Sequence, residues 1–254
     1  MWSSVSGRAI KLYPCRRSRG ANQRQEARYV ATTRVIVKDG IAGERAVERL
    51  KRLIFTGDLA PGEQLRQEDM ARRPAVSRPL VREALRALAM QGLIEHRPHQ
   101  GFFVAKRAPI ELAQIMLMLD LLEPELMRSM TQPLPVVLGR REELNRRMEE
   151  LIDEWDNFET LTLNREFHFL LFDESPYRLV LQEVERPWVL AEPFISQKLS
   201  SPRSRLLAVE EQRHIIAALS AGDLATAADA HDTHRASGRQ GVLPLLTRPS
   251  QTTT

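Results

Sequence analysis

Residues 76–85 read VSRPLVREAL, and this stretch decides the fold of the N-terminal half of the chain. Arg78 and Arg82 stand four residues apart, so on a helix their guanidinium groups share one face. Ser77 before them is a natural N-cap, and a proline at position 79 is tolerated in a first turn. Apolar residues recur on another face of the same helix: Val81, Ala84, Leu85 and Leu88. The pattern predicts a helix with a buried apolar stripe and an exposed arginine face.

The segments around this helix predict a winged helix-turn-helix. Apolar residues at three- and four-residue intervals predict an amphipathic helix over 42–55, and a short helix is expected over 67–73, ended by Pro74. After Gly92, the runs LIEHR and FFVAK are joined by PHQG and predict a β-hairpin. In this arrangement the second helix of the pair enters the major groove of DNA, and the hairpin is the wing.

An exposed arginine pair at the start of a recognition helix suits DNA binding. An arginine fork on guanine is the commonest specific contact in the major groove, and arginines also bind phosphates. The alternative is that arginines at this spacing only keep a helix face soluble. The N-cap, the short helix before it and the wing after it all agree, and they favour double-stranded DNA as a partner.

The runs GDLAPGEQL and MARRPAVSRPLVREALRALAMQGLIEHRPHQGFFV resemble the winged-helix domain of GntR-family bacterial transcription regulators, over about residues 42–106. The resemblance implies a set of DNA-binding residues on the recognition helix and at the wing tip: Ser77, Arg78, Arg82, His99, Gln100 and Gly101. The family commonly has Leu-Gly where this chain has Pro74-Ala75, and Thr-Pro where it has Pro79-Leu80. The missing threonine removes a phosphate or base contact, so the usual half-site sequence is not expected to carry over.

The composition indicates the class of protein and the cellular compartment in which it is expected. The 254 residues are 43 % hydrophobic and 28 % charged, which is typical of a soluble globular protein. The apolar stretch 110–127 is interrupted by acidic residues, so no membrane span is expected. Cys15 is the single cysteine, which excludes an intrachain disulfide and favours the cytoplasm.

Positive charge gathers at the N-terminus. Residues 1–40 hold nine Lys and Arg against two Asp and Glu, a net charge of +7, whereas the whole chain carries +4. Residues 1–39 show no sustained apolar period and are expected to form a largely disordered basic arm that can touch nucleic acid. A solvated tail and an over-long gene start are the alternatives, and a targeting peptide is disfavoured because no clean apolar segment is present.

The second half of the chain is predicted to be helical throughout. Six helices are expected, over 110–130, 140–157, 161–172, 177–199, 206–221 and 224–238. The predicted fold class is therefore mainly α. A winged helix-turn-helix domain over 40–107 is followed by an all-helical bundle over 108–246, and a disordered tail over 247–254 ends the chain.

Four histidines fall on the helices of this bundle, where converging imidazoles can hold a transition metal. The runs NREFHFLL and RHIIAALSAGDLATAADAHDTH resemble the FCD ligand-binding domain of the FadR subfamily of GntR regulators. That resemblance implies a divalent metal such as Zn, Ni or Mn, with His231 outside the pattern and four ligands within it: Asn164, His168, His214 and His234. Asparagine stands where aspartate is usual, so weaker metal binding is expected.

The same resemblance implies a small organic acid as the effector. The family tends to place an arginine on the first bundle helix to hold a carboxylate. Here Leu119 and Asp120 stand near the expected position, and Arg128 is the nearest candidate for effector binding.

The expected protein is a homodimeric, ligand-responsive transcription regulator rather than an enzyme. It is expected to bind a palindromic operator, and most members of the family act as repressors. One alternative is an architectural DNA-binding dimer without effector response. Another is a metal-dependent enzyme that uses His168, His214 and His234 with Glu166 or Glu211 as base, but no nucleophile elbow, phosphate loop or paired-carboxylate motif accompanies these residues.

Overall fold

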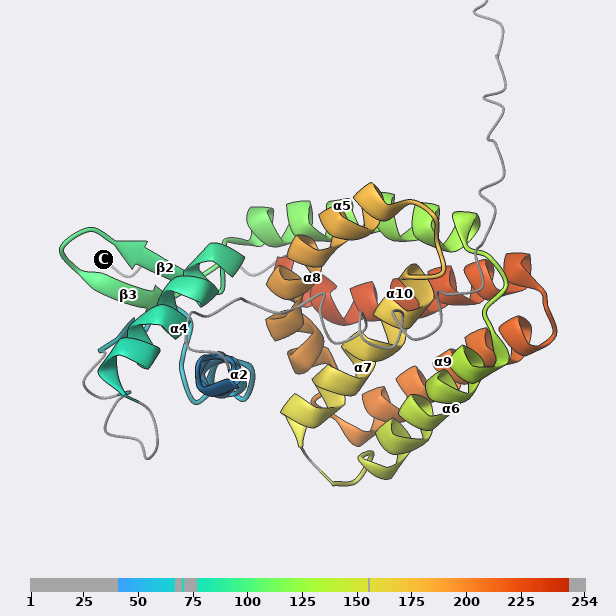
Figure 1. The fold of residues 1–254 in the computed structure, drawn as a ribbon, viewed down its shortest axis with the longest axis horizontal. Helices are drawn as coiled ribbons and strands as arrows, with labels where there is room; N and C mark the ends of the chain where they lie inside the picture. Colours follow the sequence, from blue (N-terminus) through green and yellow to red (C-terminus); the bar gives the residue numbers. More distant parts are fainter. Residues whose placement is uncertain (1–40, 67–69, 71–76, 155, 247–254) are drawn as a thin grey trace, which may run out of the picture. The chain divides into compact units, whose positions relative to one another are not determined.

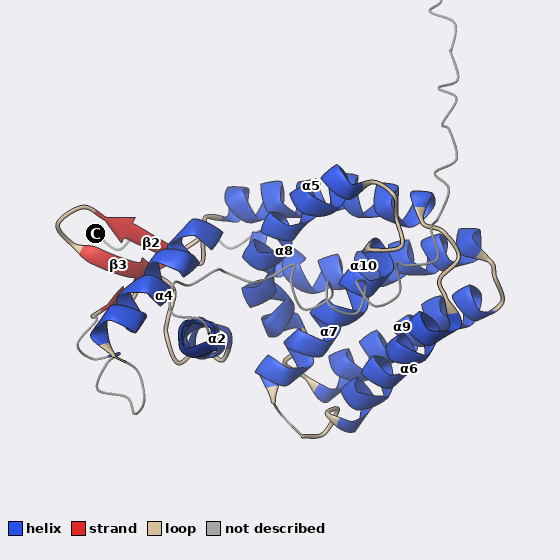
Figure 2. Cartoon of the chain, in the orientation of Figure 1, coloured by secondary structure: helices blue, strands red, loops and turns tan. Residues whose placement is uncertain are grey.

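The computed structural model describes residues 41–66, 70, 77–154 and 156–246. The predicted basic arm, most of the predicted short helix over 67–73 and the predicted C-terminal tail lie outside these residues. The described elements run from α2 to α10 and are mostly helices (Figure 1). The three short strands all belong to the N-terminal part (Figure 2).

The N-terminal part is built from two described helices and one sheet. The helices are α2 (Ile41–Phe55) and α4 (Arg78–Gln91), and the strands are β1 (Gln64–Leu65), β2 (Ile94–Arg97) and β3 (Gly101–Val104). The sheet has the order β1-β3-β2 and is antiparallel, with Leu65 opposite Phe102 and Ile94 opposite Val104. The hairpin is confirmed, whereas the two-residue strand β1 was not expected from the sequence, because two residues are too few to show an alternating pattern.

Helix α4 begins and ends where its sequence predicts. Ser77 precedes the helix with an extended backbone (φ −75°, ψ 154°), although its side chain makes no capping hydrogen bond. Gly92 ends the helix in the left-handed conformation (φ 80°), and its N–H donates to the carbonyls of Leu88 and Ala89. A glycine adopts this conformation without the Cβ clash that penalises other residues. Leu85 and Leu88 are completely buried, as the predicted stripe requires.

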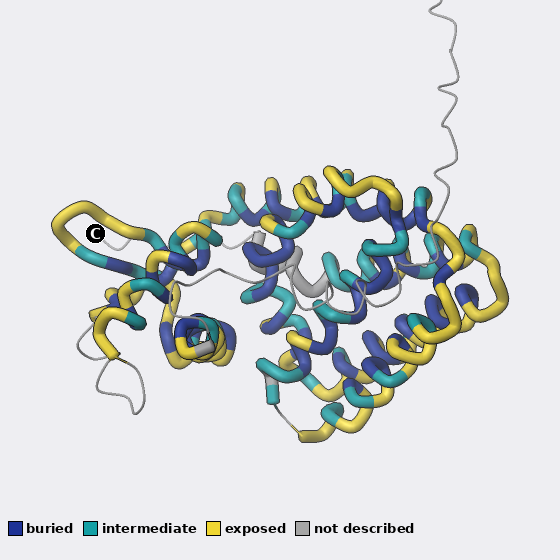
Figure 3. Tube along the Cα trace, in the orientation of Figure 1, coloured by how far each residue is buried: buried dark blue, intermediate teal, exposed yellow. Residues whose placement is uncertain are grey.

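The C-terminal part is the predicted helical bundle. Its six described helices are α5 (Pro109–Ser129), α6 (Pro135–Glu150), α7 (Asn157–Phe172), α8 (Arg178–Lys198), α9 (Pro202–Ser220) and α10 (Leu224–Leu246). Each helix turns a buried stripe inward and an exposed stripe outward (Figure 3). None of the helices within the described ranges is long and apolar enough to cross a membrane.

Several helix boundaries differ from the prediction by four residues or more. Helix α6 ends at Glu150 instead of residue 157, α9 begins at Pro202 instead of residue 206, and α10 ends at Leu246 instead of residue 238. Helix α6 begins at Pro135 instead of residue 140, because proline fits the first helical turn, where its missing N–H leaves no bond unmade. Helix α7 begins at Asn157 instead of residue 161, because the carboxylate of Asp156 accepts a 3.0 Å hydrogen bond from the N–H of Glu159 and caps the helix.

Candidate DNA-binding surface and effector pocket

The exposed face of α4 carries the predicted arginines. Arg78 and Arg82 are both exposed, and neither guanidinium makes a hydrogen bond or an ion pair with any described residue. Arg86, one turn further on, pairs with Glu83 at 2.9 Å. Arg78 and Arg82 are therefore available to an anionic or hydrogen-bonding partner, as a recognition helix requires.

The wing tip lies at the turn between β2 and β3. His99 has a positive φ of 61° and Gly101 a φ of 95°, so the turn depends on a residue pair that tolerates left-handed conformations. Gln64 donates a 2.7 Å hydrogen bond from Nε2 to the carbonyl of Gln100 and thereby ties β1 to the tip. His99 and Gln100 are exposed, and they remain predicted DNA contacts.

The helical part encloses a pocket of about 90 Å³, which has room for several water-sized groups. Residues from all its helices except α6 line this pocket. The lining is mainly apolar, with Met116, Leu119 and Ile195 among its residues. Its polar lining comes from Asn164 and His168 on α7, Lys198 on α8, and His234, Arg235 and Arg239 on α10, together with two acidic residues of α5.

Three buried imidazoles meet beside the pocket. Nε2 of His168 lies 3.2 Å from Nε2 of His234, and Nδ1 of His168 lies 3.3 Å from Nε2 of His231. Burial lowers the pKa of all three, for His231 to about 3, so burial favours their neutral forms. Glu211 binds Nδ1 of His234 at 2.7 Å and partly offsets the effect of burial on that residue.

Three of the four predicted metal ligands, Asn164, His168 and His234, line the pocket together. The fourth predicted ligand does not lie with them. His214 is exposed on α9, away from the cluster, which corrects its assignment as a ligand. The residue of α9 that faces α7 is Gln212, which is completely buried and donates a 3.0 Å hydrogen bond from Nε2 to Oδ1 of Asn164. The signal was present in the sequence, because Gln212 shares a helical stripe with Ala208 and Leu219, whereas His214 does not.

The side chains around the predicted metal site do not fit a divalent transition metal. Such a site needs several imidazole or carboxylate ligands, and here two neutral amides, Asn164 and Gln212, are bonded to each other. The Lys198 ammonium is close enough to lower the pKa of both His168 and His234, and it would repel a cation placed between them. Within the described ranges, no group of three or more His, Cys, Asp and Glu side chains is arranged to hold a metal ion.

The basic groups of the pocket differ in whether they are already paired. Arg235 and Arg239 both bind the carboxylate of Asp120, and Arg235 also pairs with Asp232 at 3.2 Å. Lys198 makes no hydrogen bond or ion pair within the described part of the chain, although Glu211 is near enough to raise its pKa against the effect of burial. Among the described residues that line the pocket, Lys198 is thus the cation without a hydrogen bond or an ion pair.

Arg128, the predicted effector ligand, lies outside the pocket. Its side chain is 61 % exposed and pairs with Glu125 at 2.8 Å, which corrects that expectation. The first bundle helix contributes Leu119, Asp120 and Glu123 to the pocket instead. The cations come from α8 and α10, and the sequence reasoning missed them because it sought an arginine on one helix only.

Glu123 is a buried acid at the wall of the pocket. Its Oε1 accepts a 2.6 Å hydrogen bond from Nε1 of Trp188, and its Oε2 lies 3.9 Å from Nε of Arg235. Burial nevertheless dominates and raises the pKa of Glu123 to about 7. The carboxyl group of Glu123 therefore gains its negative charge as the pH rises through about 7.

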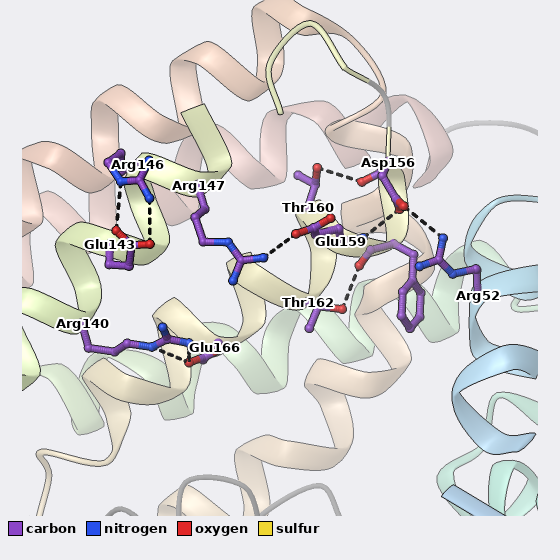
Figure 4. A network of polar contacts seen from close by, with 11 residues as sticks. Arg52, Arg140, Glu143, Arg146, Arg147, Asp156, Glu159, Thr160, Thr162 and Glu166 are labelled. Carbon is purple, nitrogen blue, oxygen red and sulfur yellow. Dashed lines mark hydrogen bonds and ion pairs between the residues drawn. The ribbon is translucent and has the colours of Figure 1, made fainter. Parts of the chain in front are cut away.

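Helix α8 joins the pocket to the N-terminal part. Its Trp188 and Lys198 line the pocket, while Oγ of Ser196 donates a 2.9 Å hydrogen bond to the carbonyl of Phe55 at the end of α2. A second link is the ion pair of Arg52 with Asp156, the residue that caps α7 (Figure 4). These contacts join α8 and the N-terminus of α7 to α2.

Two known protein families match the chain. Residues 42–104 match the bacterial regulatory proteins of the gntR family, and residues 114–237 match the FCD domain. Over 142 residues the chain is 30 % identical to the uncharacterized HTH-type transcriptional regulator YdhC of Bacillus subtilis, covering 51 % of this chain and 59 % of that protein. It is 26 % identical over 179 residues to the HTH-type transcriptional regulator McbR of Escherichia coli, covering 68 % of this chain and 80 % of McbR.

Solved structures share the fold at low sequence identity. E. coli McbR/YncC superposes with a TM-score of 0.62 at 21 % identity, covering 81 % of this chain and 96 % of that one. A putative transcriptional regulator GntR from Rhodococcus sp. RHA1 superposes with a TM-score of 0.65 at 20 % identity, covering 82 % and 99 % of the two chains. The chain therefore carries a helix-turn-helix domain that matches the gntR family over residues 42–104, followed by an FCD domain over residues 114–237.

Proposed function

We propose that this regulator is a homodimeric repressor that leaves its operator when a small organic acid binds the pocket of the helical part. The observation that carries the proposal is a pocket with unpaired positive charge, lined by the same helix, α8, that bonds to α2 of the DNA-binding part. One helix, α8, thereby contributes both to the pocket and to a contact with α2.

For DNA, the proposal assigns base or phosphate contacts to Arg78 and Arg82. Both stand at the N-terminal end of α4, the end that a recognition helix presents to base edges. His99, Gln100 and Gly101 contact the neighbouring groove or backbone from the wing. A dimer with two-fold symmetry places two such helices on the half-sites of a palindromic operator.

For the effector, the proposal rests on charge and burial. The largely apolar wall removes the ligand from water, and the cationic groups of α8 and α10 favour a negative charge. A carboxylate satisfies both conditions at small size. Binding shifts DNA affinity only if the effector prefers one arrangement of the two DNA-binding parts over the other, and α8 is the element that carries this preference to α2.

The test is release of DNA by organic acids. The purified protein is bound to an operator fragment at one stated salt concentration, and acetate, lactate, succinate, citrate and benzoate are titrated at constant ionic strength. At least one acid is expected to weaken DNA binding, and the complex is expected to hold two chains per fragment by light scattering. DNA binding that resists every acid would support an architectural protein without effector response.

A catalytic role is not proposed. The enzyme hypothesis required His168, His214 and His234 around a metal-bound water, and His214 is exposed, away from the other two. Glu166, one suggested base, is held by Arg140 on an exposed surface, as Figure 4 shows.

A further inference from the structure

We infer that Lys198 takes the place of a metal ion as the cation of the effector pocket, so that this regulator binds a carboxylate without any metal. The inference rests on the proposed function in one respect, since it assumes that the pocket receives an organic acid.

The first observation is the pair of amides at two positions of the metal site implied by the family resemblance. Asn164 stands where aspartate is usual, and Gln212 occupies the place expected of a histidine on α9. Their mutual hydrogen bond uses Oδ1 of Asn164, the only atom of that side chain that could bind a metal ion. An amide is a weaker metal ligand than the carboxylate or imidazole expected at each position. Of the expected ligands, only the imidazoles of His168 and His234 remain.

The second observation is the position of Lys198. It lines the pocket together with Asn164, His168 and His234. Nζ also lies 3.5 Å from the position that a Cβ would take at Gly238, which places the ammonium against α10.

The third observation is charge balance. An aspartate and three neutral histidines around a divalent ion carry a net charge of +1, and an ammonium beside neutral amides and imidazoles carries the same charge. The pocket therefore keeps its attraction for an anion although two of the four metal ligands are replaced by amides. Arg235 and Arg239 are less suited than Lys198 to bind the carboxylate of an effector, because both already bind Asp120.

The fourth observation is that the Lys198 ammonium makes no hydrogen bond or ion pair with any residue that the structure describes, although the Glu211 carboxylate is near enough to raise its pKa. The arginines of α10, by contrast, are paired. A largely buried ammonium without an acceptor gains more from a carboxylate than an exposed one does, because desolvation strengthens the interaction.

The experiment uses the whole chain and does not involve DNA. Trp188 lines the pocket, so replacing Trp2 and Trp155 by phenylalanine makes its fluorescence a direct report of occupancy. Acetate is the probe, titrated in the presence of EDTA against sodium chloride at equal ionic strength. Metal content is measured by mass spectrometry after incubation with Zn²⁺, Ni²⁺ or Mn²⁺ and dialysis.

The expected results are saturable acetate binding in EDTA and less than a tenth of a metal ion per chain. Lys198→Met is expected to weaken acetate binding by about tenfold to a hundredfold, the effect of losing a charge-assisted hydrogen bond. Lys198→Arg keeps the charge and should bind within a few-fold of the parent. Arg128→Met removes an exposed cation outside the pocket and should change nothing, and circular dichroism confirms that each variant is folded.

A gain of metal binding gives an independent check. Asn164→Asp, Gln212→His and Lys198→Met together rebuild the ligand set and remove the ammonium, so this variant is expected to retain about one metal ion per chain. The inference is overturned if the parent protein holds one metal per chain, if EDTA abolishes acetate binding, if acetate does not bind, or if Lys198→Met binds acetate as well as the parent. The proposed function fails separately, when DNA is not bound or no acid releases it.

Discussion

Gln212 on α9 donates a hydrogen bond of 3.0 Å to Oδ1 of Asn164 on α7, and both side chains are buried. The bond joins two helices beside the pocket and occupies a position at which the family resemblance implies a metal. A buried acceptor that loses its donor is costly, because water does not replace the lost bond. Removing the hydrogen bond between Gln212 and Asn164 should therefore lower the free energy of unfolding measurably.

Gln212→Ala is expected to lower the free energy of unfolding by about 1 to 3 kcal/mol, since it leaves Oδ1 of Asn164 buried without its donor. Urea denaturation followed by circular dichroism measures the change. His214→Ala on the exposed face of the same helix is the matched control and should cost less than about 0.5 kcal/mol. Equal effects of the two substitutions would contradict the placement of Gln212 inside and His214 outside.

Arg82→Ala is expected to weaken binding to a specific DNA site by about 1 to 3 kcal/mol and to reduce discrimination between sites, if the side chain contacts a base. Fluorescence anisotropy on the preferred fragment and on scrambled fragments measures both effects. Arg146→Ala on α6, also an exposed arginine, is the control and should leave DNA affinity unchanged. Uniform weakening on all fragments would instead identify Arg82 as a phosphate contact.

The buried Glu123 predicts a pH dependence of stability. Its pKa is raised to about 7 in the folded protein against 4.5 for an ordinary glutamate, so the folded state binds more protons between these two values. The stability that Glu123 contributes is complete below about pH 4.5 and is lost as the pH rises through about 7. The loss is bounded by about 3 kcal/mol.

Glu123→Gln removes this titration and keeps an oxygen for Nε1 of Trp188. Urea denaturation at pH 5 and pH 8 is therefore expected to show that the variant gains stability relative to the parent as the pH rises. The comparison between the two proteins is needed because His231, with its pKa lowered to about 3, gives the opposite trend over part of the range. A pH-independent difference between parent and variant would show that Glu123 does not titrate there.

The bond between Ser196 and Phe55 is expected to stabilise the attachment of α2. Ser196→Ala removes the donor to the Phe55 carbonyl and should lower the free energy of unfolding by about 1 kcal/mol. Ser220→Ala, at the exposed end of α9, should stay within about 0.5 kcal/mol of the parent. Hydrogen exchange adds a local test, since amides near the end of α2 should exchange faster in Ser196→Ala alone.

Local sequence signals were sufficient for most of the fold. The stripe containing Leu85 and Leu88 and the hairpin after Gly92 each depend on neighbours in sequence, and both are present in the structure. Boundaries were less certain where a proline or a cap decided them, as at Pro135 and Asp156, because both residues occur equally in loops.

The pocket was less predictable because it depends on which residues of distant helices meet. The resemblance to known families suggested ligands by position, and a two-residue error on α9 chose His214 in place of Gln212. Lys198 was not predicted as a pocket residue, since a lysine near the end of a helix is ordinarily solvated. Only packing of α7, α8 and α10 around one space shows that this lysine faces two histidines.

The most direct test of the account is whether the protein recognises one DNA sequence. Fluorescence anisotropy is measured against fragments tiled across the region upstream of the protein's own gene, at one stated salt concentration with competitor DNA present. The account predicts tight binding to one fragment, at least a hundredfold above the others, and loss of that preference in the Arg78→Ala, Arg82→Ala double variant. Equal and weak binding to every fragment would contradict it, because only the general positive charge of the chain would then be acting.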